Sequence, residues 1–230
     1  MSRLADNLVH IRRRITEAAE RSGRSAESVS LVAVTKSVAV EQTRELALAG
    51  CLDLGEGRPQ ELWSKAPALA DLEVRWHLIG HLQRNKVDRT LPLVSMIHSV
   101  DSLRLLRAID TAAAALGRTM PVLLEVNISG DAAKHGFSPA EMPERLAEAA
   151  ACTHVQIRGL MAMAGLDGDA DRARRDFRNL RELCDRLRDL PGGAGLGELS
   201  MGMSGDFEAA VEEGATIVRI GSALFEGIGA

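Results

Sequence analysis

A single lysine follows an apolar, β-branched run near the start of the chain. Residues 31–35 (LVAVT) have the composition of a strand that is buried on both faces, and Lys36 comes directly after them. A lysine at a strand end most often extends its ammonium group into water. Where apolar walls remove that water, the pKa of the amine falls, and the neutral amine becomes a nucleophile that can form a Schiff base with an aldehyde or ketone. The position of Lys36 in the fold decides between these two roles.

Two segments near the C-terminus are rich in glycine and serine. They are residues 200–210 (SMGMSGDFEAA) and 219–225 (RIGSALF), and each follows an apolar run of strand type at the start of a predicted helix. Small residues let backbone N–H groups approach an anion, and a helix N-terminus favours negative charge. One such loop alone is more often a simple turn. Two of them predict a phosphate site, and together with Lys36 they predict a phosphorylated carbonyl compound as the ligand.

Apolar runs of strand type alternate with helical patterns along the chain. The runs lie at 31–36, 51–55, 74–80, 96–100, 121–128, 155–163, 198–203 and 216–220. Helical patterns are clearest at 102–116 and 169–189, and an amphipathic helix at 4–21 precedes the first strand. This alternation predicts a single domain over 1–230, a TIM-type (β/α)8 barrel with an extra N-terminal helix. An open doubly wound sheet is the alternative architecture.

In a barrel of this type the active site is built from the loops at the C-terminal ends of the strands. Lys36 would then lie at the end of the first strand, and the two glycine- and serine-rich loops would follow the seventh and eighth strands. We therefore expect the lysine and the phosphate site to meet at one end of the barrel, which favours the Schiff-base role of Lys36.

Composition and charge restrict the classes of partner. The 230 residues are 46% hydrophobic with a net charge of −4, and the arginines are scattered among acidic residues on helical stretches, so nucleic-acid binding has no support. The three cysteines are widely spaced, which argues against a disulfide framework and fits a reducing cytoplasm. No apolar run reaches the length of a signal peptide core or a membrane span. We expect a cytoplasmic protein without a membrane partner, and a monomer because no apolar seam stands out.

No metal site is predicted from the sequence. His77 and His81 are four residues apart, as metal ligands on a helix can be, but they lie in a strand-to-loop stretch in which no third ligand is evident. Lining of a cofactor pocket or ordinary packing is the interpretation that we favour for both histidines.

A set of motifs then carries a resemblance that covers essentially the whole chain. In order they are VAVTK (32–36), LGE (54–56), WHLIGHLQRNK (76–86), EVNIS (125–129), KHG (134–136), RGLMAM (158–163) and LSMGMSGDFEAAVEEGATIVRIGSALF (199–225). These motifs resemble the YggS/PROSC family of pyridoxal 5′-phosphate (PLP) homeostasis proteins, which are barrels related to the N-terminal domain of alanine racemases. The resemblance implies PLP as the cofactor, held by Lys36 as an imine. It also implies that Arg219 faces the pyridine nitrogen and that the phosphate is bound by Ser200, Met201, Gly221 and Ser222.

The same resemblance bears on catalysis. Racemisation on this scaffold resembles a two-base process, in which a lysine works on one face of the substrate and a tyrosine from a second domain on the other. This chain contains no tyrosine. An arginine at the ring nitrogen also keeps its own proton, which makes the cofactor a weaker electron sink. No catalytic residue is therefore assigned.

We expect a protein that holds PLP reversibly and buffers or delivers it within the cell, without strong catalytic activity. Its partners would be PLP and PLP-dependent apoenzymes. Two alternatives stay open. One is a PLP-dependent amino-acid racemase or lyase of low activity, and the other is a cofactor-free Schiff-base aldolase that uses the lysine alone.

Overall fold

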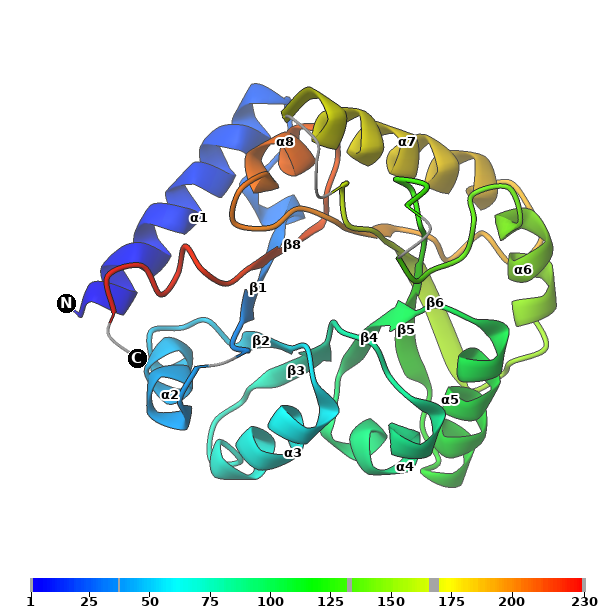
Figure 1. Cartoon of the computed structure of the whole chain (residues 1–230), viewed down its shortest axis with the longest axis horizontal. Coiled ribbons are helices and arrows are strands. Elements are labelled where there is room, and N and C mark those ends of the chain that lie inside the picture. Colours follow the sequence, from blue (N-terminus) through cyan, green and yellow to red (C-terminus); the bar gives the residue numbers. More distant parts are fainter. Residues whose placement is uncertain (1, 37, 132–133, 166–169, 229–230) are drawn as a thin grey trace.

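In the computed structural model the chain forms a closed barrel of parallel strands, which follow one another around the ring in sequence order (Figure 1). The structure describes residues 2–36, 38–131, 134–165 and 170–228. Pairing of the first strand with the last, Ser30 opposite Ile217, closes the ring and excludes the open sheet. The strands are β1 (Ser30–Val34), β2 (Asp53–Glu56), β3 (Arg75–Leu78), β4 (Met96–Val100), β5 (Met120–Glu125), β6 (Val155–Met161), β7 (Glu198–Ser200) and β8 (Ile217–Ile220).

Helices surround the barrel on its outside, as Figure 1 shows. Each strand lies within, or within two residues of, one of the eight runs predicted from the sequence, so the predicted (β/α)8 architecture is confirmed. The helices are α1 (Arg3–Arg21), α2 (Val40–Leu48), α3 (Pro59–Ala68), α4 (Val87–Thr90), α5 (Leu103–Ala115), α6 (Met142–Ala149), α7 (Ala170–Arg188) and α8 (Phe207–Glu212).

Successive residues of a strand point alternately into the barrel and towards the helices. The outward residues join the main hydrophobic core between the strands and the helices. Inside the barrel a smaller apolar cluster is formed by Val32, Leu123, Met161 and Ile217. By the same alternation the side chain of Arg219, two residues after Ile217, also points into the barrel. The interior therefore holds polar as well as apolar side chains.

The predicted N-terminal helix is confirmed as α1, and it packs beside α8 and the C-terminal residues (Figure 1). Arg14 donates two hydrogen bonds of 2.8 Å to the carboxylate of Glu208 in α8. The side-chain amide of Asn7 donates 3.0 Å hydrogen bonds to the carbonyl groups of Leu224 and Glu226. The extra helix thus holds the chain just beyond β8, which carries one of the predicted phosphate loops.

Among the described residues, no helix combines the length and the apolar character needed to cross a bilayer. The three cysteines are free thiols, and two of them are buried.

Candidate functional site

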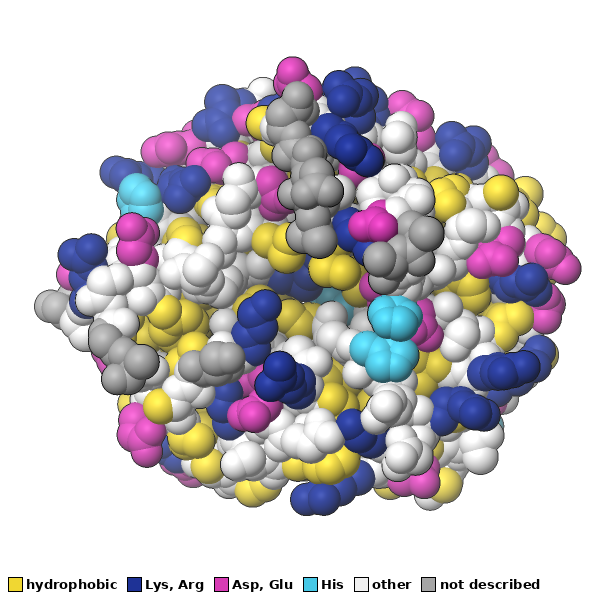
Figure 2. Space-filling model, in the orientation of Figure 1, with side chains coloured by type: hydrophobic (Ala, Val, Ile, Leu, Met, Phe, Trp, Pro, Cys, Tyr) yellow, Lys and Arg dark blue, Asp and Glu magenta, His cyan; other side chains and the backbone are white. Residues whose placement is uncertain are grey.

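A cavity of about 550 Å³ opens at the C-terminal ends of the strands. Figure 2 shows this face of the molecule, hollowed near its centre between basic side chains and a patch of histidine. The residues that line the cavity come from the loops after seven of the strands and from the strand ends: Val34, Lys36, Gly57, Ile79, Gly80, His81, Glu125, His135, Met163, Met203, Ser204, Gly205, Arg219, Gly221 and Ser222.

Lys36 lines this cavity, but its side chain is exposed. The expectation that apolar walls remove water from its amine is wrong. The physical reason is that β1 ends at Val34, so Lys36 lies in the turn after the strand and not within the barrel wall. At this position the amine can be reached from solvent by a ligand that enters the cavity.

The backbone just before Lys36 is held by a buried ion pair. Lys65 Nζ donates to Glu56 Oε1 and to the carbonyl oxygen of Thr35, both at 2.7 Å, and Thr35 Oγ1 donates to the same carboxylate oxygen at 2.7 Å. All three side chains are buried. This network fixes the residue from which Lys36 extends.

The two glycine- and serine-rich loops meet at the cavity. Ser204 Oγ accepts hydrogen bonds of 3.3 Å from the backbone N–H groups of Gly221 and Ala223, so it joins the loop after β7 to the loop after β8. A hydroxyl that accepts two hydrogen bonds still has its own hydrogen to donate. Within the described ranges, the backbone N–H groups of Ser204, Gly205 and Ser222 find no acceptor. The joined loops therefore offer several convergent donors to an anion.

Ser200 and Met201 do not reach the cavity. Both are fully buried, and by the alternation along β7 the side chain of Ser200 points into the barrel while that of Met201 packs in the outer core. The hydroxyl of Ser200 is already engaged. It accepts a 2.6 Å hydrogen bond from Arg219 Nη1 and lies 2.8 Å from His98 Nδ1. Six site residues were predicted from the sequence. Lys36, Arg219, Gly221 and Ser222 line the cavity, whereas Ser200 and Met201 do not.

Arg219 lies at the inner end of the cavity and is 4% exposed. Its Nη2 donates to the carbonyl oxygen of Ala162 at 3.1 Å. Burial lowers the pKa of Arg219 to about 10, against the opposite effect of the charges on Glu125 and Asp206. The guanidinium is still a cation at neutral pH. It therefore places a fixed positive charge at the bottom of the cavity.

A file of hydrogen-bonded side chains crosses the barrel interior and ends at Arg219. Asp53 Oδ1 lies 3.2 Å from His77 Nε2, His77 Nδ1 lies 2.9 Å from His98 Nε2, and His98 in turn contacts Ser200. Burial, with smaller contributions from the charges on His77 and Arg219, holds the pKa of His98 well below 6.5. At neutral pH His98 is therefore uncharged. The file orients the guanidinium of Arg219 through the hydroxyl of Ser200.

The structure also separates the two histidines considered together in the sequence. His77 lies inside the barrel in this file, which is a packing role, while His81 lines the cavity. Sequence reasoning did not name most of the other lining residues, among them Ser204, Gly205 and Glu125. Ser204 and Gly205 lie within the segment that was singled out, and Glu125 opens the EVNIS motif, so the motifs marked these positions without identifying the side chains that matter.

The sequence and fold have clear relatives. A family profile described as the N-terminal domain of alanine racemase matches residues 7–228. A protein of Pseudomonas aeruginosa named pyridoxal phosphate homeostasis protein is 40% identical over 225 residues, which is 98% of this chain and 96% of the relative. One of the same name from Deinococcus radiodurans is 44% identical over 212 residues, 92% of this chain and 95% of the relative. This chain belongs to the family of pyridoxal phosphate homeostasis proteins.

A structure of the family member PipY from Synechococcus elongatus, described as having PLP bound, covers 96% of this chain and 99% of its own with 37% identity and a TM-score of 0.86. The membership that the motifs indicated is thereby confirmed. The Pseudomonas aeruginosa pyridoxal phosphate homeostasis protein thus matches the sequence of this chain over nearly its full length, and PipY matches its barrel.

Proposed function

We propose that this chain binds PLP in the cavity at the C-terminal end of the barrel and takes part in PLP homeostasis by buffering or delivering the cofactor. The observation that carries the proposal is the convergence in one cavity of an accessible lysine, a fixed cation and two joined loops with N–H groups that find no acceptor among the described residues. The names of the relatives and the PLP-bound structure of PipY support it. We further propose that the protein acts as a monomer in the cytoplasm, where its free thiols stay reduced.

The residues fit the two ends of the cofactor. The phosphate is matched by the free hydroxyl hydrogen of Ser204 and the unpaired N–H groups of Gly205 and Ser222. Charge-assisted hydrogen bonds to phosphate are stronger than neutral ones. A Cβ atom on Gly221 would lie 3.3 Å from the Cβ atom of Val34. Because glycine has no side chain, the loop after β8 can pass close to the end of β1. The phosphate position proposed for this chain is therefore Ser204 and Gly205 with Gly221 and Ser222, in place of Ser200 and Met201.

When bound, PLP supplies an aldehyde that condenses with a primary amine. Lys36 offers that amine at the cavity mouth, and the buried network around Thr35 holds its backbone in place. Arg219 offers a guanidinium N–H to the ring nitrogen. Because a guanidinium keeps its proton at neutral pH, this contact leaves the ring nitrogen as an acceptor and favours storage of the cofactor over carbanion chemistry.

Low catalytic activity is part of the proposal, and so are PLP-dependent apoenzymes as recipients. Support for low activity comes from the sequence, which lacks the tyrosine that a two-base racemase would use. A substantial amino-acid racemase rate from the pure protein, abolished in Lys36→Ala, would contradict this part and leave PLP binding intact.

Titration of the purified protein with PLP tests the proposal directly. We expect a yellow 1:1 complex with the absorbance of a PLP–amine adduct, lost in Lys36→Ala. Lys36→Ala should retain measurable affinity for PLP through the phosphate loops, which dialysis can quantify. A protein that stays colourless in excess PLP would overturn the proposal and favour a cofactor-free aldolase.

A further inference from the structure

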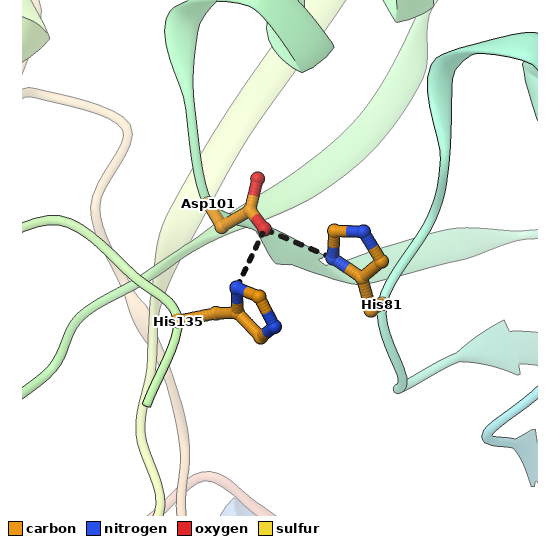
Figure 3. Close-up of side chains that lie close together, drawn as sticks. All are labelled: His81, Asp101 and His135. Atoms are coloured by element: carbon orange, nitrogen blue, oxygen red, sulfur yellow. Dashed lines mark hydrogen bonds and ion pairs between the residues drawn. The ribbon is translucent and has the colours of Figure 1, made fainter. Parts of the chain in front are cut away.

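Two histidines and an aspartate lie together at the mouth of the cavity, as Figure 3 shows. His81 Nδ1 is 3.1 Å from Asp101 Oδ2, and His135 Nδ1 is 4.0 Å from the same oxygen. The two imidazole rings are stacked, with their centroids 4.7 Å apart and their planes at 20°. In each residue, one potential ligand atom lies within 4.8 Å of those of the other two.

These separations are close to those in a metal site. Ligand atoms at about 2.0–2.2 Å from a Zn²⁺ ion are roughly 3–3.5 Å from one another. The His81–Asp101 pair already has this spacing, and His135 needs a shift of less than about 1 Å towards the carboxylate to reach it. Side-chain rotation of an exposed histidine is sufficient for such a shift.

The charge of the cluster also favours a cation. The side chain of Asp101 is only 12% exposed, and within the described part of the chain its ion-pair partners are these two imidazoles, with no lysine or arginine among them. An imidazole neutralises a carboxylate only when it is protonated. A divalent ion would supply the positive charge that Asp101 lacks among these ion-pair partners.

The three residues are positioned by neighbouring strands. His81 follows β3, Asp101 is the first residue after β4, and His135 lies in the loop after β5. His81 lines both the cavity and a polar groove beside it, and Asp101 lines that groove. The cluster therefore stands on the ridge between two hollows, where an ion can enter from solvent without any movement of the barrel.

We propose that His81, Asp101 and His135 form a binding site for a divalent transition-metal ion of the Zn²⁺ type. Nitrogen ligands from two histidines with one carboxylate oxygen suit Zn²⁺ and its first-row neighbours, and disfavour Mg²⁺ and Ca²⁺, which take oxygen ligands. Three protein ligands leave at least one coordination position for water or another small ligand. The site needs none of the residues that we propose to bind PLP, so it can be tested without the cofactor.

The test is isothermal titration of the full chain with ZnCl₂ at neutral pH, after removal of metal by a chelator and of PLP by dialysis. We expect one Zn²⁺ per chain. We also expect binding to weaken in acid, because protons compete for the imidazoles. His81→Ala, Asp101→Asn and His135→Ala should each weaken Zn²⁺ binding about tenfold or more, because even outer-shell partners of a metal contribute 10–100-fold.

His10→Ala is the matched control, since His10 is an exposed histidine on α1, far along the chain from the cluster. It should bind Zn²⁺ as the unaltered protein does. Thermal unfolding separates loss of the site from loss of the fold. In chelator the cluster variants should melt close to the unaltered protein, and only the unaltered protein and His10→Ala should gain stability with Zn²⁺. Absence of one-to-one Zn²⁺ binding, or binding that survives all three substitutions, would overturn the proposal.

Discussion

Ser200→Ala and Ser204→Ala form a matched pair that tests how the site is divided between the barrel interior and the cavity. Ser200 is buried between Arg219 and His98, with hydrogen-bond distances of 2.6 and 2.8 Å. Its loss leaves two buried polar groups each without one partner, at about 1–3 kcal/mol each. We therefore expect Ser200→Ala to lower the free energy of unfolding by about 2–6 kcal/mol. Ser204 is only half-buried and makes two longer hydrogen bonds, so Ser204→Ala should cost less than about 1 kcal/mol.

The effects on ligand affinity should have the opposite order, with Ser204→Ala affected more than Ser200→Ala. The ratio of the Kd values for pyridoxal and PLP isolates the contribution of the phosphate. Loss of a charge-assisted hydrogen bond from Ser204 should reduce this ratio about tenfold or more. Ser200→Ala should leave the ratio nearly unchanged, because its hydroxyl does not face the cavity.

The assays are urea unfolding followed by circular dichroism and equilibrium binding of both ligands to the same preparations. A Ser200→Ala variant that is destabilised by less than about 1 kcal/mol would refute the account of the barrel interior. If the ratio of the Kd values for pyridoxal and PLP falls strongly in Ser200→Ala and is unchanged in Ser204→Ala, the phosphate site lies at Ser200 and Met201, as the sequence first indicated.

Three further predictions concern stability and the close approach of the last loop. In the unfolded chain His98 takes up a proton below about pH 6.5, whereas in the folded chain its pKa is lower. The free energy of unfolding should therefore fall by about 1.4 kcal/mol for each pH unit below about 6.5, relative to the His98→Asn variant. Urea unfolding at a series of pH values measures this. Gly221→Val should weaken PLP binding, because the added side chain would crowd Val34 where both residues line the cavity. The fold should be retained, and a PLP titration with a matched thermal melt checks both expectations. Lys65→Met should destabilise the protein by about 3–5 kcal/mol because it leaves Glu56 buried and charged, and adding Glu56→Gln should recover much of that loss in urea unfolding.

The barrel could be predicted from the sequence because its strands are short apolar runs at regular intervals, and each was found near its predicted position. Lys36 and the two loops were found because they immediately follow such runs. Their detailed roles depended on where each strand ends. β1 ends two residues before Lys36, which leaves the amine exposed, and β7 ends at Ser200, whose inward direction turns its hydroxyl away from the cavity.

Contacts between distant loops could not be predicted in the same way. Asp101 and His135 are 34 residues apart, and only the closure of neighbouring strands brings both to His81. The polar file from Asp53 to Arg219 is likewise invisible in the sequence, because a histidine in an apolar run does not reveal which face of the strand it occupies. A single sequence gives the order of the strands, and the barrel geometry decides which side chains meet.

Borohydride trapping followed by peptide mapping tests the central claim most directly. Reduction of the PLP-loaded protein should attach the cofactor covalently to Lys36, the one lysine among the residues that line the described cavity. Lys134 and Lys65 are poor acceptors, since the first donates a 2.7 Å hydrogen bond to the carbonyl oxygen of Ala164 and the second is buried in its ion pair. Predominant labelling of Lys36, absent in Lys36→Ala, is the predicted result. Predominant labelling of Lys134, Lys86 or Lys65, or no covalent product, would contradict the account.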